Sequence, residues 1–225
     1  MALYRWKEEC KGIIIPTCAI FVILNIIFPV LLWMQIKDYA LDITFSTVNE
    51  QLQAVVPFLS ALPCALLLRK RFDSGVDEAI HMLPVLQKET PMLIVFLEIV
   101  SVILFCPLFI WLRHVYKVFL WVEFVRTILQ TIYLQNLSYY TTNLIRFSAA
   151  GVLAQVIVGG GMQLSLLMPY QWTRIIELFN IYDHISMDNP RPISAIRALL
   201  TIAVSVFFWM EAKKRERFSL SSIQN

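Results

Sequence analysis

The sequence predicts an all-α integral membrane protein with six transmembrane helices, and its composition and the pattern of its apolar residues are the reasons. Of the 225 residues, 58% are hydrophobic and only 16% are charged, whereas soluble domains are about 45–50% apolar and about 25% charged. The mean hydropathy is +0.66. The apolar residues form long runs, and a helix needs about 20 such residues to cross the hydrocarbon core of a bilayer. The net charge of +3 is too small to indicate a nucleic-acid-binding face.

Six apolar segments are the predicted spans of one transmembrane domain that covers residues 1–225. The first and third are nearly continuous apolar runs, and the second is short and contains two prolines, which membrane helices tolerate. The fourth is the most polar. The fifth contains Gly159, Gly160 and Gly161, a triplet typical of close approach between helices or of a soft point in one helix. In chain order the predicted spans are 12–34, 53–68, 91–112, 118–138, 147–168 and 193–210.

The distribution of Lys and Arg predicts the orientation, because cytoplasmic loops of membrane proteins carry an excess of these residues. If both termini are cytoplasmic, the inner segments hold twelve of the 19 and the outer segments hold six, while Arg126 lies inside a span. The basic segment 113–117 fits this scheme poorly, so an arrangement with one span misassigned stays open. The inner residues are Arg5, Lys7, Lys11, Arg69, Lys70, Arg71, Lys88, Arg146, Lys213, Lys214, Arg215 and Arg217.

A short amphipathic helix is predicted between the second and third spans, over residues 74–83. Ser74 and Asp77 have the spacing of a helix-capping pair. Pro84 ends the helix, because its ring would clash with the preceding turn. Two further amphipathic patterns occur at 1–11 and 172–183. The apolar stripe of the 74–83 helix consists of Val76, Ala79, Ile80 and Leu83.

Three charged residues inside the predicted spans are candidates for function, since charges at membrane depth are costly and are usually functional or paired. Glu123 and Arg126 stand three residues apart, where side chains on one helix face can meet. They form either a self-neutralising pair, which is the favoured interpretation, or the polar lining of a substrate path. Glu98 is either a buried hydrogen-bond donor in its neutral form or a partner for Arg126.

Motifs of catalytic and metal sites are missing from the sequence. It contains no HExxH, no GxSxG and no GxxxxGK[ST]. The four cysteines, Cys10, Cys18, Cys64 and Cys106, form no CxxC pair, which speaks against a zinc site or a disulfide scaffold. We therefore expect a chain that is not itself an enzyme, holds no metal and binds ATP by no P-loop of its own.

The segment from Arg71 to Pro84 resembles a pattern found in the permease subunits of ABC exporters of the second type, which have the type V exporter fold. The pattern is R-x-x-x-G-x-x-E-x-x-x-x-x-P, and Gly75, Glu78 and Pro84 match it. The resemblance implies that a short helix after the second span docks on the ATPase. It also implies that six spans are accompanied by an outer amphipathic, re-entrant-like segment before the last span. The implied ATPase-coupling residues are Ser74, Gly75, Val76, Asp77, Glu78, Ala79, Ile80, Leu83 and Pro84.

The same resemblance implies the function. The chain would be the transmembrane subunit of an ATP-driven exporter in the plasma membrane, forming a path for a hydrophobic or amphipathic substrate such as a peptide or a drug. Its partners would be ABC ATP-binding subunits, which hold the ATP and Mg²⁺, and a second copy or a related permease. Three alternatives stay open: a haem-export-type permease, an immunity or scaffold factor, and a membrane-embedded enzyme.

Overall fold

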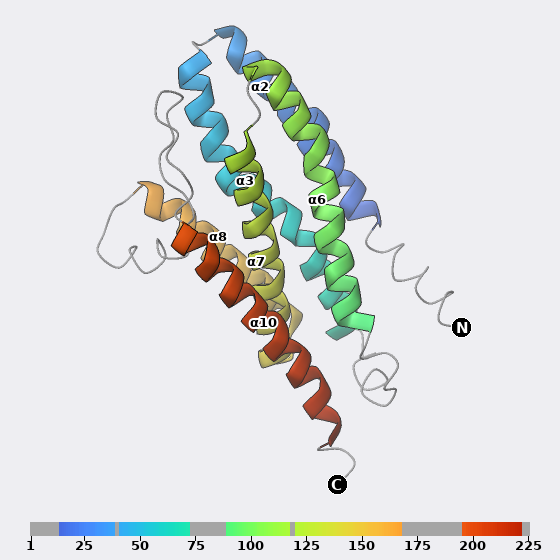
Figure 1. Ribbon diagram of the computed structural model, residues 1–225. Coiled ribbons are helices and arrows are strands. Elements are labelled where there is room, and N and C mark those ends of the chain that lie inside the picture. The colour runs from blue at the N-terminus through green and yellow to red at the C-terminus, as the bar shows by residue number, and fades with distance from the viewer. Residues whose placement is uncertain (1–13, 39–40, 73–88, 118–119, 168–194, 222–225) are drawn as a thin grey trace.

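The computed structural model describes residues 14–38, 41–72, 89–117, 120–167 and 195–221 (Figure 1). Every regular element in these ranges is helical and none is a strand, as the sequence predicted. Residues 14–22 are helical and continue into the π-helix η1 (Ile23–Ile27) and then α2 (Phe28–Asp38). The remaining helices are α3 (Leu41–Phe72), α6 (Glu89–Tyr116), α7 (Trp121–Ile145), α8 (Ser148–Leu167) and α10 (Ala195–Ser221).

The helices form an elongated bundle in which successive helices run in opposite directions (Figure 1). The central helix is α7, which contacts α3, α6, α8 and α10. The helix made by residues 14–38 packs against α3 and α6. The ends of α3 and α10 therefore lie at the same end of the bundle as the start of α6. A hydrogen bond of 2.5 Å from Thr90 Oγ1 to Glu216 Oε1 joins α6 to α10 there.

Three helices extend by about two turns or more beyond the spans that the sequence predicted. The second predicted span, 53–68, is only part of α3, and the fourth and sixth, 118–138 and 193–210, continue to Ile145 and Ser221. An apolar run shows only which part of a helix can lie in the hydrocarbon core of a bilayer. The helix itself continues until its backbone hydrogen bonds are interrupted. At α7 that end is Arg146, which adopts a left-handed conformation with φ 60° and bonds the Thr142 carbonyl at 2.8 Å.

Two of the described helices are long and apolar enough to cross a membrane. They are Ile14–Met34, with a hydropathy of 2.5, and Thr90–Tyr116, with a hydropathy of 2.8. Val55–Arg69 and Ser148–Gly160 are apolar but shorter. The structure thus supports the first and third predicted spans by length and composition, and the other four stay predictions.

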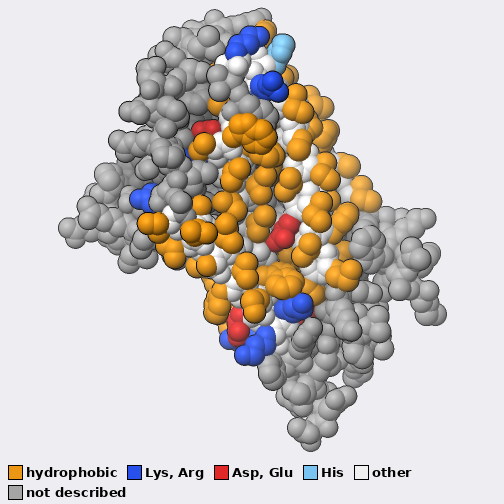
Figure 2. All heavy atoms as spheres, in the orientation of Figure 1, with side chains coloured by type: hydrophobic (Ala, Val, Ile, Leu, Met, Phe, Trp, Pro, Cys, Tyr) orange, Lys and Arg blue, Asp and Glu red, His pale blue; other side chains and the backbone are white. Residues whose placement is uncertain are grey.

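Apolar side chains fill the core of the described bundle and many also lie on its outer surface, whereas α7 buries many polar side chains. Large hydrophobic side chains cover the outside, with Ile15 76% exposed, Ile196 72% and Met92 67%. Figure 2 shows a broad hydrophobic face with Lys and Arg near its two ends. Soluble monomers rarely expose apolar patches of such extent. The buried polar and charged residues on α7 are Glu123, Arg126, Thr127, Gln130, Thr131, Gln135, Asn136, Ser138, Thr142 and Asn143.

A side-chain amide supports the region where η1 contacts α6. Asn25 Nδ2 donates to the Phe21 carbonyl in its own helix and to the Leu104 carbonyl in α6, both at 3.2 Å. Leu104 precedes Pro107 by three residues, and a proline inside a helix removes one backbone donor and disturbs the preceding turn. Asn25 therefore provides a hydrogen bond to a carbonyl in the turn that Pro107 disturbs.

The closest approach between α7 and α8 occurs at Gly151, not at the glycine triplet. A Cβ atom at Gly151 would lie less than 3.0 Å from the side-chain oxygens of Thr142 and Ser138. A Cβ at Gly159 would meet a Phe58 ring carbon at 3.6 Å, and one at Gly160 would meet nothing within 4 Å. The predicted close approach is therefore absent at Gly160, whereas Gly159 lies at ordinary contact distance from Phe58 of α3.

Candidate functional site

The predicted ATPase-coupling helix, 74–83 with Pro84, lies outside the described residues, and so do the amphipathic segments 1–11 and 172–183. The structure describes the chain on both sides of the coupling segment, where α3 ends at Phe72 and α6 begins at Glu89. The role of the nine predicted coupling residues stays a prediction.

Glu123 and Arg126 are both buried near the start of α7, with exposed fractions of 6% and 1%. Thr127 lies one turn after Glu123 and donates its hydroxyl to the Glu123 backbone carbonyl at 2.7 Å. The helical spacing that the sequence analysis used is present, since both residues belong to α7. The ion pair between them stays a prediction, as does a role in a substrate path.

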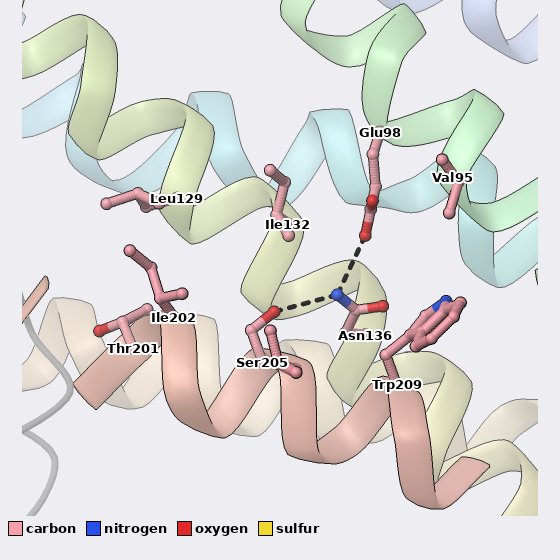
Figure 3. Close-up of a pocket in the computed structure, with 10 residues that line it drawn as sticks. Val95, Glu98, Leu129, Ile132, Asn136, Thr201, Ile202, Ser205 and Trp209 are labelled. Carbon is pink, nitrogen blue, oxygen red and sulfur yellow. Dashed lines mark hydrogen bonds between the residues drawn. The ribbon is translucent and has the colours of Figure 1, made fainter. Parts of the chain in front are cut away.

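Glu98 is held by Asn136 of α7. Asn136 Nδ2 donates to Glu98 Oε1 at 3.0 Å and also to Ser205 Oγ of α10 at 3.0 Å (Figure 3). One buried amide therefore links α6, α7 and α10. Arg126 precedes Asn136 by ten residues on α7, which corresponds to about 15 Å along a helix. Glu98 here accepts a hydrogen bond from Asn136, and both interpretations, a donor in its neutral form and a partner for Arg126, stay predictions.

A cavity of about 400 Å³ surrounds this network. It lies between α6 and α10, with α7 as its floor; Glu98, Asn136 and Ser205 lie at its centre, and Thr201 lies to one side (Figure 3). Val95, Ile202 and Val206 at its rim are 38%, 43% and 49% exposed, so the cavity opens on the apolar outer surface of the bundle. The lining residues are Val95, Glu98, Leu129, Ile132, Asn136, Thr201, Ile202, Ser205, Val206 and Trp209.

Two buried polar atoms of the lining have no hydrogen-bond partner among the described residues. They are Asn136 Oδ1 and Trp209 Nε1. Asn136 is only 4% exposed, and both of its N–H groups are used by Glu98 and Ser205. An unbonded polar atom in a buried position is costly. The cavity therefore presents an acceptor and a donor that a ligand or water can satisfy.

A second buried carboxylate, Glu216, was not singled out from the sequence. It is 5% exposed and accepts hydrogen bonds from Thr90 Oγ1 and from the Tyr139 hydroxyl, both at 2.5 Å. It lies beyond the predicted end of the sixth span. The signal that indicates it is the helical spacing of Trp209, Ala212 and Glu216, which places all three on one face of an extended α10.

Candidate metal ligands do not gather in the part of the chain that the structure describes, where no group of three or more His, Cys, Asp and Glu residues could hold an ion. Cys18, Cys64 and Cys106 are free thiols, and Cys64 is buried. The network around Asn136 contains a carboxylate, an amide and a hydroxyl, and its arrangement suits the binding of a polar group.

Comparison with known proteins gives no matching family model, curated protein or solved structure. Any proposal for the function of this chain therefore rests on its own residues and on their geometry.

Proposed function

We propose that this chain is the transmembrane subunit of an ATP-driven ABC exporter of the second type. In this proposal it crosses the plasma membrane six times, with both termini in the cytoplasm, and pairs with a second copy or a related permease. Separate ATP-binding subunits hold ATP and Mg²⁺. The paired transmembrane subunits provide the path for a hydrophobic or amphipathic substrate.

The observation that supports the proposal best is the position of Glu98. It belongs to the candidate span Thr90–Tyr116, yet it lines a cavity with Asn136 and Ser205, and no Lys or Arg among the described residues forms an ion pair with it. An ionisable side chain at membrane depth is costly and usually marks a pathway for a substrate or an ion. A cavity with a polar centre and apolar walls is also the usual form of a small-molecule site.

The location of the coupling segment is a second line of support. The helices that flank it end and begin near the C-terminal part of α10, because Thr90 bonds Glu216. That part of α10 carries Lys213, Lys214 and Arg215. A basic end is expected on the cytoplasmic side of a membrane protein. The segment 74–84 would then face the cytoplasm, where an ATPase subunit can dock.

The test is whether an ATPase co-purifies with the chain. The tagged chain is purified in mild detergent from the cells that naturally produce it, and its ATP hydrolysis and photolabelling by azido-ATP are measured. We expect vanadate-sensitive hydrolysis, with the photolabel on a separate polypeptide. The double variant Glu78→Arg with Ile80→Asp should lose both signals, because it reverses a charge and places a carboxylate in the apolar stripe.

Asp73→Arg is the matched control, since it reverses a charge next to the predicted 74–83 helix without altering its stripe. This variant should keep the ATPase. Absence of any nucleotide-binding subunit in the wild-type preparation would contradict the proposal. Full hydrolysis in the double variant would contradict the assigned docking segment.

A further inference from the structure

The polar centre of the α6–α7–α10 cavity needs a hydrogen-bond donor. Both N–H groups of Asn136 are already used, which leaves its Oδ1 as an unbonded acceptor. Glu98 receives a single hydrogen bond in the described part of the chain, at Oε1, although a carboxylate can accept about four. A ligand that fits these two acceptors therefore carries several N–H groups, whereas the unbonded Trp209 Nε1 needs an acceptor from water or from another part of the ligand.

The charge of the cavity favours a cation. Among the described residues, no Lys or Arg forms an ion pair with Glu98, and no other lining residue is charged. Trp209 at the rim already attracts an ammonium group, since Lys213 Nζ stands 4.4 Å from its ring centroid. A partly buried carboxylate without a counter-charge is costly, and a ligand cation reduces that cost.

The walls of the cavity favour an alkyl or aromatic tail. Around the polar centre they consist of the side chains of Val95, Leu129, Ile132, Ile202 and Val206, together with the Trp209 ring. The exposed residues of the rim lie on the outer surface that we assign to the lipid, so a tail can enter from the bilayer without crossing water.

We propose that this cavity binds an amphipathic amine, with its ammonium group on Glu98 and Asn136 Oδ1 and its apolar tail along α6 and α10. This inference rests on the proposed function in placing the cavity within the membrane, and it names the substrate class of that path. A primary ammonium suits the site better than a quaternary one, because only the primary group can donate hydrogen bonds to the two acceptors.

The test is equilibrium binding of three probes with equal tails to the full chain in phosphatidylcholine nanodiscs, corrected for empty nanodiscs. The probes are dodecylamine, dodecyltrimethylammonium and dodecanol. We expect dodecylamine to bind at least about tenfold more tightly than either of the others, as a charge-assisted hydrogen bond predicts. Equal affinities for dodecylamine and dodecanol in the wild-type chain would overturn the inference without any variant.

The variant Glu98→Gln removes the charge but keeps a carbonyl oxygen that can accept the hydrogen bond of Asn136. It should weaken dodecylamine about tenfold or more and leave dodecanol unchanged. Glu211→Gln is the control, because Glu211 pairs with Arg215 at 3.3 Å and does not line the cavity. Unchanged dodecylamine affinity in Glu98→Gln contradicts the inference.

A second variant, in the apolar wall, tests whether the probes bind in this cavity. Val206→Trp fills the cavity from its exposed rim and leaves every polar group of the centre in place. It should reduce saturable binding of all three probes, and unchanged dodecylamine binding would contradict the location.

The binding assay needs no ATPase, so the two proposals can fail separately. If the chain co-purifies with no ATPase but binds the amine saturably and in a Glu98-dependent way, the amine site is supported and the exporter function is contradicted. ATP-driven export that does not depend on Glu98 supports the exporter and contradicts the cavity.

Discussion

The side-chain amide of Gln135 donates a hydrogen bond of 3.2 Å to the backbone carbonyl of Ser60, three residues before Pro63. The same Nε2 atom donates to Ser101 Oγ at 3.0 Å, so α3, α6 and α7 meet at one amide. Asn25 has the same relationship to Leu104 and Pro107. In both cases a side-chain amide from a neighbouring helix bonds a carbonyl in the turn that a proline disturbs. Membrane helices commonly tolerate proline in this way.

Replacement of Gln135 by Leu should destabilise the bundle, because both of its hydrogen bonds are lost and the Ser60 carbonyl loses its side-chain donor. We expect a loss of about 1–2 kcal/mol in the free energy of unfolding, since hydrogen bonds between membrane helices contribute about 0.6 kcal/mol on average and at most about 1.7. Unfolding in mixed micelles with increasing sodium dodecyl sulfate measures it.

The background Pro63→Ala tests whether the amide compensates for the proline. Alanine removes the ring that clashes with the Leu59 carbonyl and lets the turn before residue 63 close normally, so Gln135→Leu should cost less in that background. We expect a coupling energy of about 0.5–1 kcal/mol between the two sites. Strictly additive effects would show that Gln135 acts through Ser101 alone.

Replacement of Gly151 by Ala should separate α7 from α8. The new methyl group would overlap Ser138 and Thr142, and overpacking of this kind costs about 1–3 kcal/mol. Gly160→Ala is the matched control in the same helix, since nothing lies within 4 Å of its Cβ position. It should be neutral or stabilising by up to about 1 kcal/mol, because alanine favours helix. Melting temperatures of the two purified variants decide the prediction, and equal values would contradict it.

Replacement of Tyr139 by Phe should loosen the end of the bundle where α6, α7 and α10 meet. The variant removes the hydroxyl that bonds Glu216, a hydrogen bond to a carboxylate that contributes about 1.5–3 kcal/mol. Tyr140→Phe is the control, because the Tyr140 ring stacks on Phe208 with centroids 5.0 Å apart and phenylalanine keeps that contact. Unfolding in sodium dodecyl sulfate measures both variants, and a larger loss in Tyr140→Phe would contradict the prediction.

Single cysteines should report the orientation in intact cells. The native cysteines are first replaced by serine, since Cys18 and Cys106 are exposed. An impermeant maleimide added outside should label three positions and spare two, because the ends of the helices alternate between the two sides. Labelling of Glu78→Cys from outside would contradict both the orientation and the docking of an ATPase. The positions expected to react are Thr44→Cys, Val115→Cys and Ser186→Cys, and those expected to stay unlabelled are Glu78→Cys and Leu220→Cys.

The sequence was sufficient to predict helices and the approximate place of each, because helical class and apolar runs are local properties. The first and third predicted spans, 12–34 and 91–112, correspond closely to the apolar helices Ile14–Met34 and Thr90–Tyr116. Glu98 was also identified from the sequence alone, since a carboxylate stands out within an apolar run. Helix ends were less predictable: α3 and α10 continue well past their apolar parts, and hydropathy does not register a polar helical turn.

Only the tertiary structure identified the partners. Asn136 lies 38 residues from Glu98, and nothing in the local pattern distinguishes it from Gln130 or Gln135 as the residue that bonds Glu98. Glu216 and Thr90 are 126 residues apart and meet because α6 and α10 bring their ends together. The spacing of residues on one helix determines which side chains share a face. Which helix that face meets depends on how all the helices pack, and this is why the cavity between α6, α7 and α10 could be found only in the folded chain.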